Sequence, residues 1–146
     1  EGEEPKRVAF FYINSKGNAV TRSSEDYISK LIGIAGGKYI FENLGDPGKH
    51  RSTVNMEMEK FYETARDADI VIYCSTIVGE LQTFDELLAL NPLLKEFKAV
   101  QNKEVWCTRK NLYQDATHYG KMALEFSQIF SGHGEEEPLD YLFKLK

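Results

Sequence analysis

The hydrophobic residues of this chain fall into short continuous runs that are separated by segments with helical spacing. Residues 7–13 and 69–74 are apolar runs of strand length, and residues 38–42 and 104–107 are shorter runs of the same kind. A continuous apolar run is typical of a strand that is buried on both faces of a parallel sheet. The pattern therefore predicts four strands in such a sheet.

Segments with helical spacing follow these runs, and each begins with residues that favour a helix start. Thr83 and Glu86 have the types and spacing of a capping box, in which side chains accept the free N–H groups of the first turn. Ser23 and Asp26 have a similar spacing. A polar cap or a first-turn proline marks the other starts, at Asn55, Pro92 and Asp115. The apolar tail, residues 138–146, is expected to pack back as a helical turn or a strand.

Strands that alternate with helices predict an α/β fold, here a three-layer α/β/α sandwich with a mainly parallel central sheet. The chain has 146 residues, which suits one domain with its own core, so residues 1–146 are assigned to a single domain. Ligands of such sheets bind beyond the carboxyl ends of the strands. That edge is expected to carry four loops, residues 14–22, 43–53, 75–83 and 108–115.

Composition narrows the class of partner. The net charge of −5 argues against nucleic acid, because a phosphate backbone requires clustered Lys and Arg. No run of 18 apolar residues occurs, so no membrane span is predicted within the chain. No signal peptide opens the sequence, and we expect the chain to be a part of a longer protein.

The sequence lacks the common motifs of enzymes. It contains no Gly-x-Gly-x-x-Gly, no Walker motif ending in Gly-Lys-Ser/Thr, no Gly-x-Ser-x-Gly and no Cys-x-x-Cys. The three histidines do not have metal-ligand spacing to one another; they are His50, His118 and His133. We therefore predict no catalytic residue, no metal site and no bound cofactor.

The two cysteines lie at the carboxyl ends of predicted strands. Cys74 follows one apolar run and Cys107 ends another, so their sulfurs lie close together if the strands are neighbours. Two readings remain open: a pair of small buried apolar residues, or a disulfide or thiol pair.

Cationic, amide and aromatic side chains gather in the predicted loops. The candidates for ligand binding are Asn14, Lys16 and Arg22 after the first strand and Arg109, Tyr113 and Gln114 after the fourth. Guanidinium and ammonium groups suit anionic or catecholate-rich ligands, and aromatic rings add flat apolar area with a polar tip. These loops therefore predict a binding surface that needs no bond chemistry.

Several segments also carry a family resemblance. Residues 53–73 read TVNMEMEKFYETARDADIVIY, residues 32–37 read IGIAGG, and residues 91–114 begin with NPLLKEF and end with NLYQ. Together with the opening strand, their order and spacing resemble the C-terminal lobe of class III periplasmic-type binding proteins. These proteins deliver iron-siderophores, haem or cobalamin to ABC importers.

The resemblance implies that the chain is one lobe of a two-lobed clamp, without its N-terminal lobe and linking helix. The ligand would lie between the lobes, and surface glutamates would dock on the ABC permease. The matching positions here are Glu59 and, next, Glu57. The resemblance also implies an extracytoplasmic location, periplasmic or as a cell-surface lipoprotein, and a role in metal or iron transport without enzymatic activity. Cys74 departs from the family, whose members tend to place a small polar residue there.

Two other functions fit the same pattern of elements. A free-standing flavodoxin-like domain, in signalling or flavin binding, would need acids or a phosphate loop after the first strand. The sequence there, Asn-Ser-Lys-Gly-Asn at residues 14–18, is a poor match to either. The third reading is an interaction domain that binds no small ligand.

Overall fold

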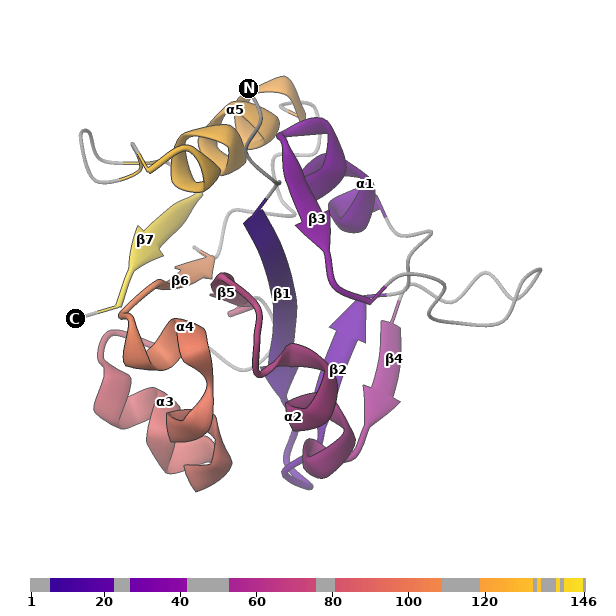
Figure 1. Ribbon diagram of the computed structural model, residues 1–146, viewed down its shortest axis with the longest axis vertical. Coiled ribbons are helices and arrows are strands. Elements are labelled where there is room, and N and C mark those ends of the chain that lie inside the picture. The colour runs from indigo at the N-terminus through magenta and orange to yellow at the C-terminus, as the bar shows by residue number, and fades with distance from the viewer. Residues whose placement is uncertain are drawn as a thin grey trace.

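A mixed sheet with helices on both faces organises the chain in the computed structural model (Figure 1). The structure describes residues 6–22, 27–41, 53–75, 81–108, 119–132, 134, 139 and 141–145. The strands are β1 Lys6–Ile13, β2 Ala19–Arg22, β3 Gly37–Tyr39, β4 Thr53–Met56, β5 Ile70–Tyr73, β6 Val105–Thr108 and β7 Leu142–Lys144. The helices are α1 Tyr27–Ile34, α2 Met58–Ala65, α3 Phe84–Leu90, the 3-10 helix η1 Pro92–Glu96, α4 Lys98–Gln101 and α5 Tyr119–Phe130.

The centre of the sheet is parallel and its flanks are antiparallel. The strand order is β4-β2-β1-β5-β6-β7, and β3 pairs with the first residues of β1. β1 is parallel to β3 and β5, and β5 is parallel to β6. β2, β4 and β7 run antiparallel to their neighbours. The prediction of a mainly parallel α/β sheet is therefore confirmed for the central strands that carry the core.

Helices cover both faces of the sheet, which confirms the three layers. α1 and α5 pack together at the top of Figure 1, and α2, α3 and α4 gather at its bottom. Neighbouring residues of a strand point to opposite faces. Phe11 of β1 accordingly contacts Phe61 of α2, whereas Trp106 of β6 lies with Ile129 of α5 against Gly134.

Aromatic rings fill the space between the sheet and α2. The ring of Phe61 lies 4.6 Å from Phe11, 5.8 Å from Phe41 and 5.5 Å from Phe97, measured between centroids. All four side chains are buried. Burying one such ring contributes about 1.5–3 kcal/mol, and ring pairs at these separations add to it. This cluster fixes α2, and with it the segment that leads from β4 into the helix.

The long apolar runs gave the central strands correctly, while two short strands were missed. β1 and β5 lie where the sequence predicted them, and the apolar tail does form a strand, β7. The loop predicted at 14–22 was partly wrong, because β2 forms over Ala19–Arg22 and pairs with β4, which begins at Thr53. The rest of the loop predicted at 43–53 lies outside the described residues. Short polar strands at the flank of a sheet lack the continuous apolar pattern that marks the central ones.

Helix caps were predicted with mixed success. Thr83 accepts a hydrogen bond from the Glu86 N–H at 3.2 Å, and Asn91 caps the helical turn that Pro92 starts. The Glu86 carboxylate accepts from the Gln82 N–H at 3.1 Å and from the Thr83 hydroxyl at 3.4 Å. Asn55 was wrong as the cap of α2, because it lies in β4 and Glu57 occupies the cap position.

Candidate functional site

The carboxyl ends of the central strands meet at one edge of the sheet. β1 ends at Ile13, β5 at Tyr73 and β6 at Thr108. Beyond β5 the chain reaches α3 on the face of α2, and beyond β6 it reaches α5 on the opposite face. Open α/β sheets bind ligands beyond the carboxyl ends of their strands, where the connections of neighbouring strands lead to opposite faces. The edge is therefore the candidate site.

Asn14 organises the turn that follows β1. Its side-chain carbonyl accepts hydrogen bonds from the Lys16 N–H and the Asn18 N–H, both at 3.0 Å. Its amide donates to Asn55 Oδ1 at 3.5 Å, which links the turn to β4. Asparagine commonly holds a turn in this way. The structure thus gives Asn14 a structural role, and its ligand contact stays a prediction.

The structure brings only some of the predicted ligand residues to the site. Lys16 is exposed in the turn at the carboxyl edge. Arg22 lies at the far end of β2, opposite Thr53, and so away from that turn. Three further candidates lie outside the described residues: Arg109, Tyr113 and Gln114. Arg109 nevertheless follows directly on Thr108, the last residue of β6.

The two glutamates singled out for docking lie beside the same edge. β4 runs parallel to β1 and ends at Met56, level with the turn after β1. Glu57 then caps α2 and Glu59 lies in its first turn, and both are exposed. Negative charge at a helix start is favourable, so both carboxylates suit this position.

A pair of buried hydroxyl groups joins the ends of β5 and β6. The Ser75 N–H donates to Thr108 Oγ1 at 2.8 Å, and Ser75 Oγ donates to the Thr108 carbonyl oxygen. The two hydroxyl oxygens lie 3.1 Å apart. Ser75 is 2% exposed and Thr108 is 0% exposed. Sequence reasoning missed this pair, because its only signal was a hydroxyl residue at the end of β6 and another shortly after β5.

Tyr73 joins the ends of β5 and β1 in a similar way. Its phenol oxygen accepts a hydrogen bond from the Ile13 N–H at 3.4 Å, and its ring meets Phe11 edge-on at 5.5 Å. Burial raises the pKa of Tyr73 to about 12, although the Ile13 N–H opposes the shift. Tyr73 therefore stays neutral at physiological pH and is no candidate base.

The cysteines are buried at this edge and no disulfide joins them. Cys107 is the register partner of Tyr73, so Cys74 comes one residue further along β5 and faces the other side of the sheet. The Cys74 N–H donates to the Phe11 carbonyl at 2.7 Å. Of the two readings, buried apolar residues fit the structure, and the disulfide does not.

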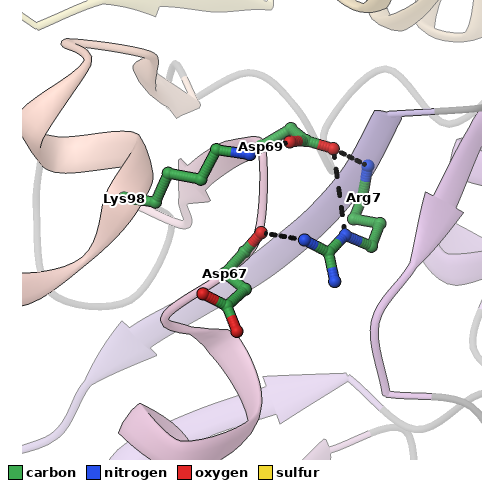
Figure 2. A network of polar contacts seen from close by, with 4 residues as sticks. All are labelled: Arg7, Asp67, Asp69 and Lys98. Carbon is green, nitrogen blue, oxygen red and sulfur yellow. Dashed lines mark hydrogen bonds and ion pairs between the residues drawn. The ribbon is translucent and has the colours of Figure 1, made fainter.

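The opposite, amino edge of the sheet carries a charged network (Figure 2). Asp69 accepts from the Arg7 N–H at 2.9 Å and from Lys98 Nζ at 2.8 Å, while the Arg7 guanidinium donates to the Asp67 carbonyl at 2.5 Å. Partial burial raises the pKa of Asp69, but the Arg7 N–H and Lys98 outweigh it and lower the pKa below the ordinary 3.8. These charges are paired with one another. The network therefore links β1 and α4 to Asp69, which directly precedes β5, and we assign no ligand-binding site to it.

Within the described ranges, no group of three or more His, Cys, Asp or Glu side chains is placed to hold a metal ion. The helices of the same part of the chain are all too short or too polar to cross a membrane.

Curated relatives of the chain are two proteins of Methanocaldococcus jannaschii. One, called uncharacterized lipoprotein MJ0872, is 27% identical over 146 residues, which cover 98% of this chain and 36% of that protein. The other, uncharacterized lipoprotein MJ0878, is 31% identical over 111 residues, or 75% of this chain and 25% of that protein. The chain thus spans about a third or less of the relatives' length. No protein-family model matches it.

Solved structures share the fold at low sequence identity. A periplasmic haem-binding protein from Pseudomonas aeruginosa matches 99% of this chain and 49% of its own, with a TM-score of 0.70 and 13% identity. The TroA-like periplasmic binding protein FepB from Veillonella parvula matches 100% and 50%, with a TM-score of 0.67 and 14% identity. The periplasmic haem-binding protein HutB of Vibrio cholerae matches 94% of this chain and 49% of its own, with a TM-score of 0.64 and 21% identity. Each match covers the whole of this chain, or nearly so, and about half of the solved one.

Proposed function

We propose that this chain, which has the fold of one half of a TroA-like periplasmic binding protein, is the C-terminal lobe of an ABC importer's substrate-binding protein. The ligand would be an iron-siderophore, haem or a cobalamin-type molecule, held between two lobes and then released to the permease. One observation carries the proposal: the fold match runs the full length of this chain and stops at about half of the solved chains. The protein would lie outside the cytoplasm, in keeping with the lipoprotein names of its relatives.

The ligand face would be the carboxyl edge of the sheet. Lys16 is exposed there, and the segment that begins at Arg109 leaves β6 at the same edge. Arg109, Tyr113 and Gln114 would supply a guanidinium, a phenol and an amide to an anionic, oxygen-rich ligand. Closing a second lobe over this edge would exclude water and strengthen each of these contacts. Such a clamp binds and releases its ligand without changing it.

The ligand proposal is tested by titrating the two-lobed protein with three probes: haemin, the iron(III) complex of 2,3-dihydroxybenzoate, and cyanocobalamin. We expect one of them to bind with a Kd of about 1 μM or tighter, and the double variant Arg109→Ala/Tyr113→Ala to bind at least about tenfold more weakly. The matched control is Arg66→Ala/Tyr62→Ala, which removes an arginine that lies over a tyrosine ring near the end of α2. Failure of all three probes, or equal affinity in both double variants, would overturn the proposal.

Docking on the permease is assigned to the exposed start of α2. A glutamate at that position presents its charge next to the ligand face, where a permease arginine can reach it while the clamp is closed. We expect Glu59→Lys to leave ligand affinity unchanged and to abolish uptake in cells. Glu63→Lys, an exposed site of the same helix one turn on, is the control and is expected to transport normally. Normal uptake by Glu59→Lys would exclude Glu59 and leave Glu57 as the candidate.

The flavodoxin-like alternative predicts a flavin phosphate at the turn after β1. Two N–H groups of that turn, of Lys16 and Asn18, already donate to Asn14, so they are not offered to a phosphate. Titration with FMN, followed by flavin fluorescence, separates the two functions: we expect no quenching.

A further inference from the structure

The helical layer of α1 and α5 exposes two large apolar side chains. Ile34, the last residue of α1, is 75% exposed, and Leu124, in the middle of α5, is 58% exposed. In the described part of the chain no other large apolar side chain is exposed, so the layer of α2, α3 and α4 shows none there. A single exposed apolar side chain is ordinary, whereas a shared apolar surface indicates a contact with another segment or molecule.

Both side chains belong to one surface, because α1 and α5 pack against each other (Figure 1). Their neighbours in sequence are small: Gly33 and Ala35 flank Ile34, and Ala123 precedes Leu124. Gly33 is exposed, and both alanines are partly buried. The distance between packed helices depends on the side chains at the contact, so small residues let a third helix come close. The surface therefore suits a helix with an apolar face.

The first strand begins beside this surface. Lys6, the first residue of β1, is the register partner of Gly37, which follows Ile34 by three residues and so lies at most about 10 Å along the chain. Gly37 in turn lies against α5, because a Cβ there would come within 2.7 Å of the Phe130 ring. Leu124 precedes Phe130 by six residues, about 9 Å along the helix. Both exposed side chains are thus near the amino end of β1.

The amino end of β1 is held on both sides. β3 pairs with it on one side. On the other side the Arg7 N–H donates to the Asp69 carboxylate at 2.9 Å, and the Asp69 N–H donates to the Arg7 carbonyl oxygen at 2.8 Å (Figure 2). A segment joined to this end would therefore leave the sheet from a fixed point. Attachment near a surface gives the attached segment a high effective concentration there.

We infer that the exposed face of α1 and α5 is the docking surface for the segment that precedes residue 1 in the longer protein, and that this segment is an amphipathic helix whose apolar side covers Ile34 and Leu124. The inference rests on the proposed function, which makes the chain one lobe of a larger protein. It goes further by assigning the surface on which the rest of that protein is mounted.

Two observations favour this occupant. The chain spans about half of the solved chains and about a third or less of its curated relatives, which leaves sequence enough for such a helix. The start of β1 lies beside the surface, whereas β7 lies at the other border of the sheet, beyond β5 and β6. A segment joined to β1 therefore reaches the surface by the shorter path.

Cysteine labelling of the intact two-lobed protein tests the inference. Ile34→Cys and Leu124→Cys are each reacted with a maleimide, and Lys95→Cys is the control at an exposed position of η1, which packs with the helices of the other face. The native Cys74 and Cys107 are buried and give the unreactive reference. We expect both test sites to react at least about tenfold more slowly than Lys95→Cys, because a docked helix opens only rarely.

Photo-crosslinking identifies what covers the surface. Leu124→benzoylphenylalanine, irradiated in the intact protein, should become joined to a peptide of the segment before residue 1, as read by mass spectrometry of the digest. Lys95→benzoylphenylalanine is the matched control and should give no product with that segment, because η1 packs with the helices of the other face.

The outcomes separate this inference from the ligand assignment. Slow labelling at two protein concentrations about fiftyfold apart, together with a crosslink to the preceding segment, supports the docking surface. Labelling as fast as at Lys95→Cys overturns it, since the surface is then bare. Protection only at the higher concentration also overturns it, because a second copy is then the occupant, and so does a crosslink to any other part of the protein. Neither experiment needs a ligand, so a protein that binds none of the three probes can still show the docking.

Discussion

The two edges of the central sheet are fastened by different chemistry. At the amino edge, Asp69 gathers Arg7 and Lys98 in a charged network whose side chains are a quarter to a half exposed. At the carboxyl edge, Ser75 with Thr108, and Tyr73 with the Ile13 N–H, form neutral hydrogen bonds between buried groups. The charged network lies at the edge of the sheet opposite the proposed ligand face, whereas the neutral hydrogen bonds lie at the edge that forms that face.

The difference indicates what each edge can tolerate. Exposed ion pairs are screened by salt and contribute little each, so the amino edge can loosen at small cost. A buried hydroxyl that loses its partner leaves an unsatisfied group, which is expensive. A binding site built over neutral, buried bonds therefore keeps its shape in changing salt and pH.

Thr108→Val is expected to show the largest effect. The substitution removes the hydroxyl that accepts from the buried Ser75 N–H at 2.8 Å. The same hydroxyl also lies within hydrogen-bond distance of Ser75 Oγ. We expect the free energy of unfolding to fall by about 2 kcal/mol. Urea denaturation in 0.05 M and in 1 M sodium chloride measures it, and the loss should be equal in both. A loss that shrinks in high salt would contradict the neutral character assigned to this edge.

Asp69→Asn is expected to show an intermediate effect, a loss of about 1 kcal/mol at pH 7, because its ion pairs are partly exposed. The loss should shrink in 1 M salt. The pKa of Asp69 is lowered in the folded state, so its contribution is complete above the ordinary pKa of 3.8 and disappears as pH falls through the lower folded value. Denaturation curves between pH 7 and pH 2 should therefore converge for the two proteins; curves that stay apart at pH 2 would show that the charge is not the cause.

Tyr73→Phe is expected to show the smallest effect at pH 7, about 0.5 kcal/mol, since the bond from the Ile13 N–H is long at 3.4 Å. In alkaline solution the wild type is expected to lose more stability than Tyr73→Phe. The folded pKa of Tyr73 is raised to about 12 from 10, so the wild type keeps its full stability below pH 10 and loses it as pH rises through 12. Denaturation at pH 9 and pH 11.5 measures this, and the variant should lose less stability over that interval. Equal losses in both proteins would mean that Tyr73 ionises normally.

The sequence sufficed to predict the centre of the fold because burial leaves a direct pattern. β1 and β5 are buried on both faces, so they read as unbroken apolar runs, and Thr83 and Pro92 mark helix starts by residue type. β2 and β4 were missed because pairing at the flank makes them strands, and pairing depends on which segments meet in space. Asn55 illustrates this: its type suits a helix cap, yet the pairing with Val20 claims it for β4.

The candidate site was predictable only in outline. The carboxyl edge follows from the order of strands and helices, and Lys16 lies there as expected. The Ser75 and Thr108 pair depends on the register between β5 and β6, which no local pattern in a single sequence specifies. Asn14 has the residue type of a ligand contact and equally that of a turn, and only its hydrogen bonds to Lys16 and Asn18 establish the second role.

The central position of β1 has a consequence for how fast the chain folds. β1 must pair with β5, and the contact from the Arg7 N–H to Asp69 spans 62 positions of sequence. Among the strand pairings of the described residues, only the hairpin of β1 and β2 is local, so it can form within about 1–10 μs, while the central pairing waits for a long loop to close. Chains dominated by such distant contacts fold in roughly milliseconds to seconds. We therefore expect the hairpin of β1 and β2 to form first, with the other edge of β1 still unpaired until β5 reaches it.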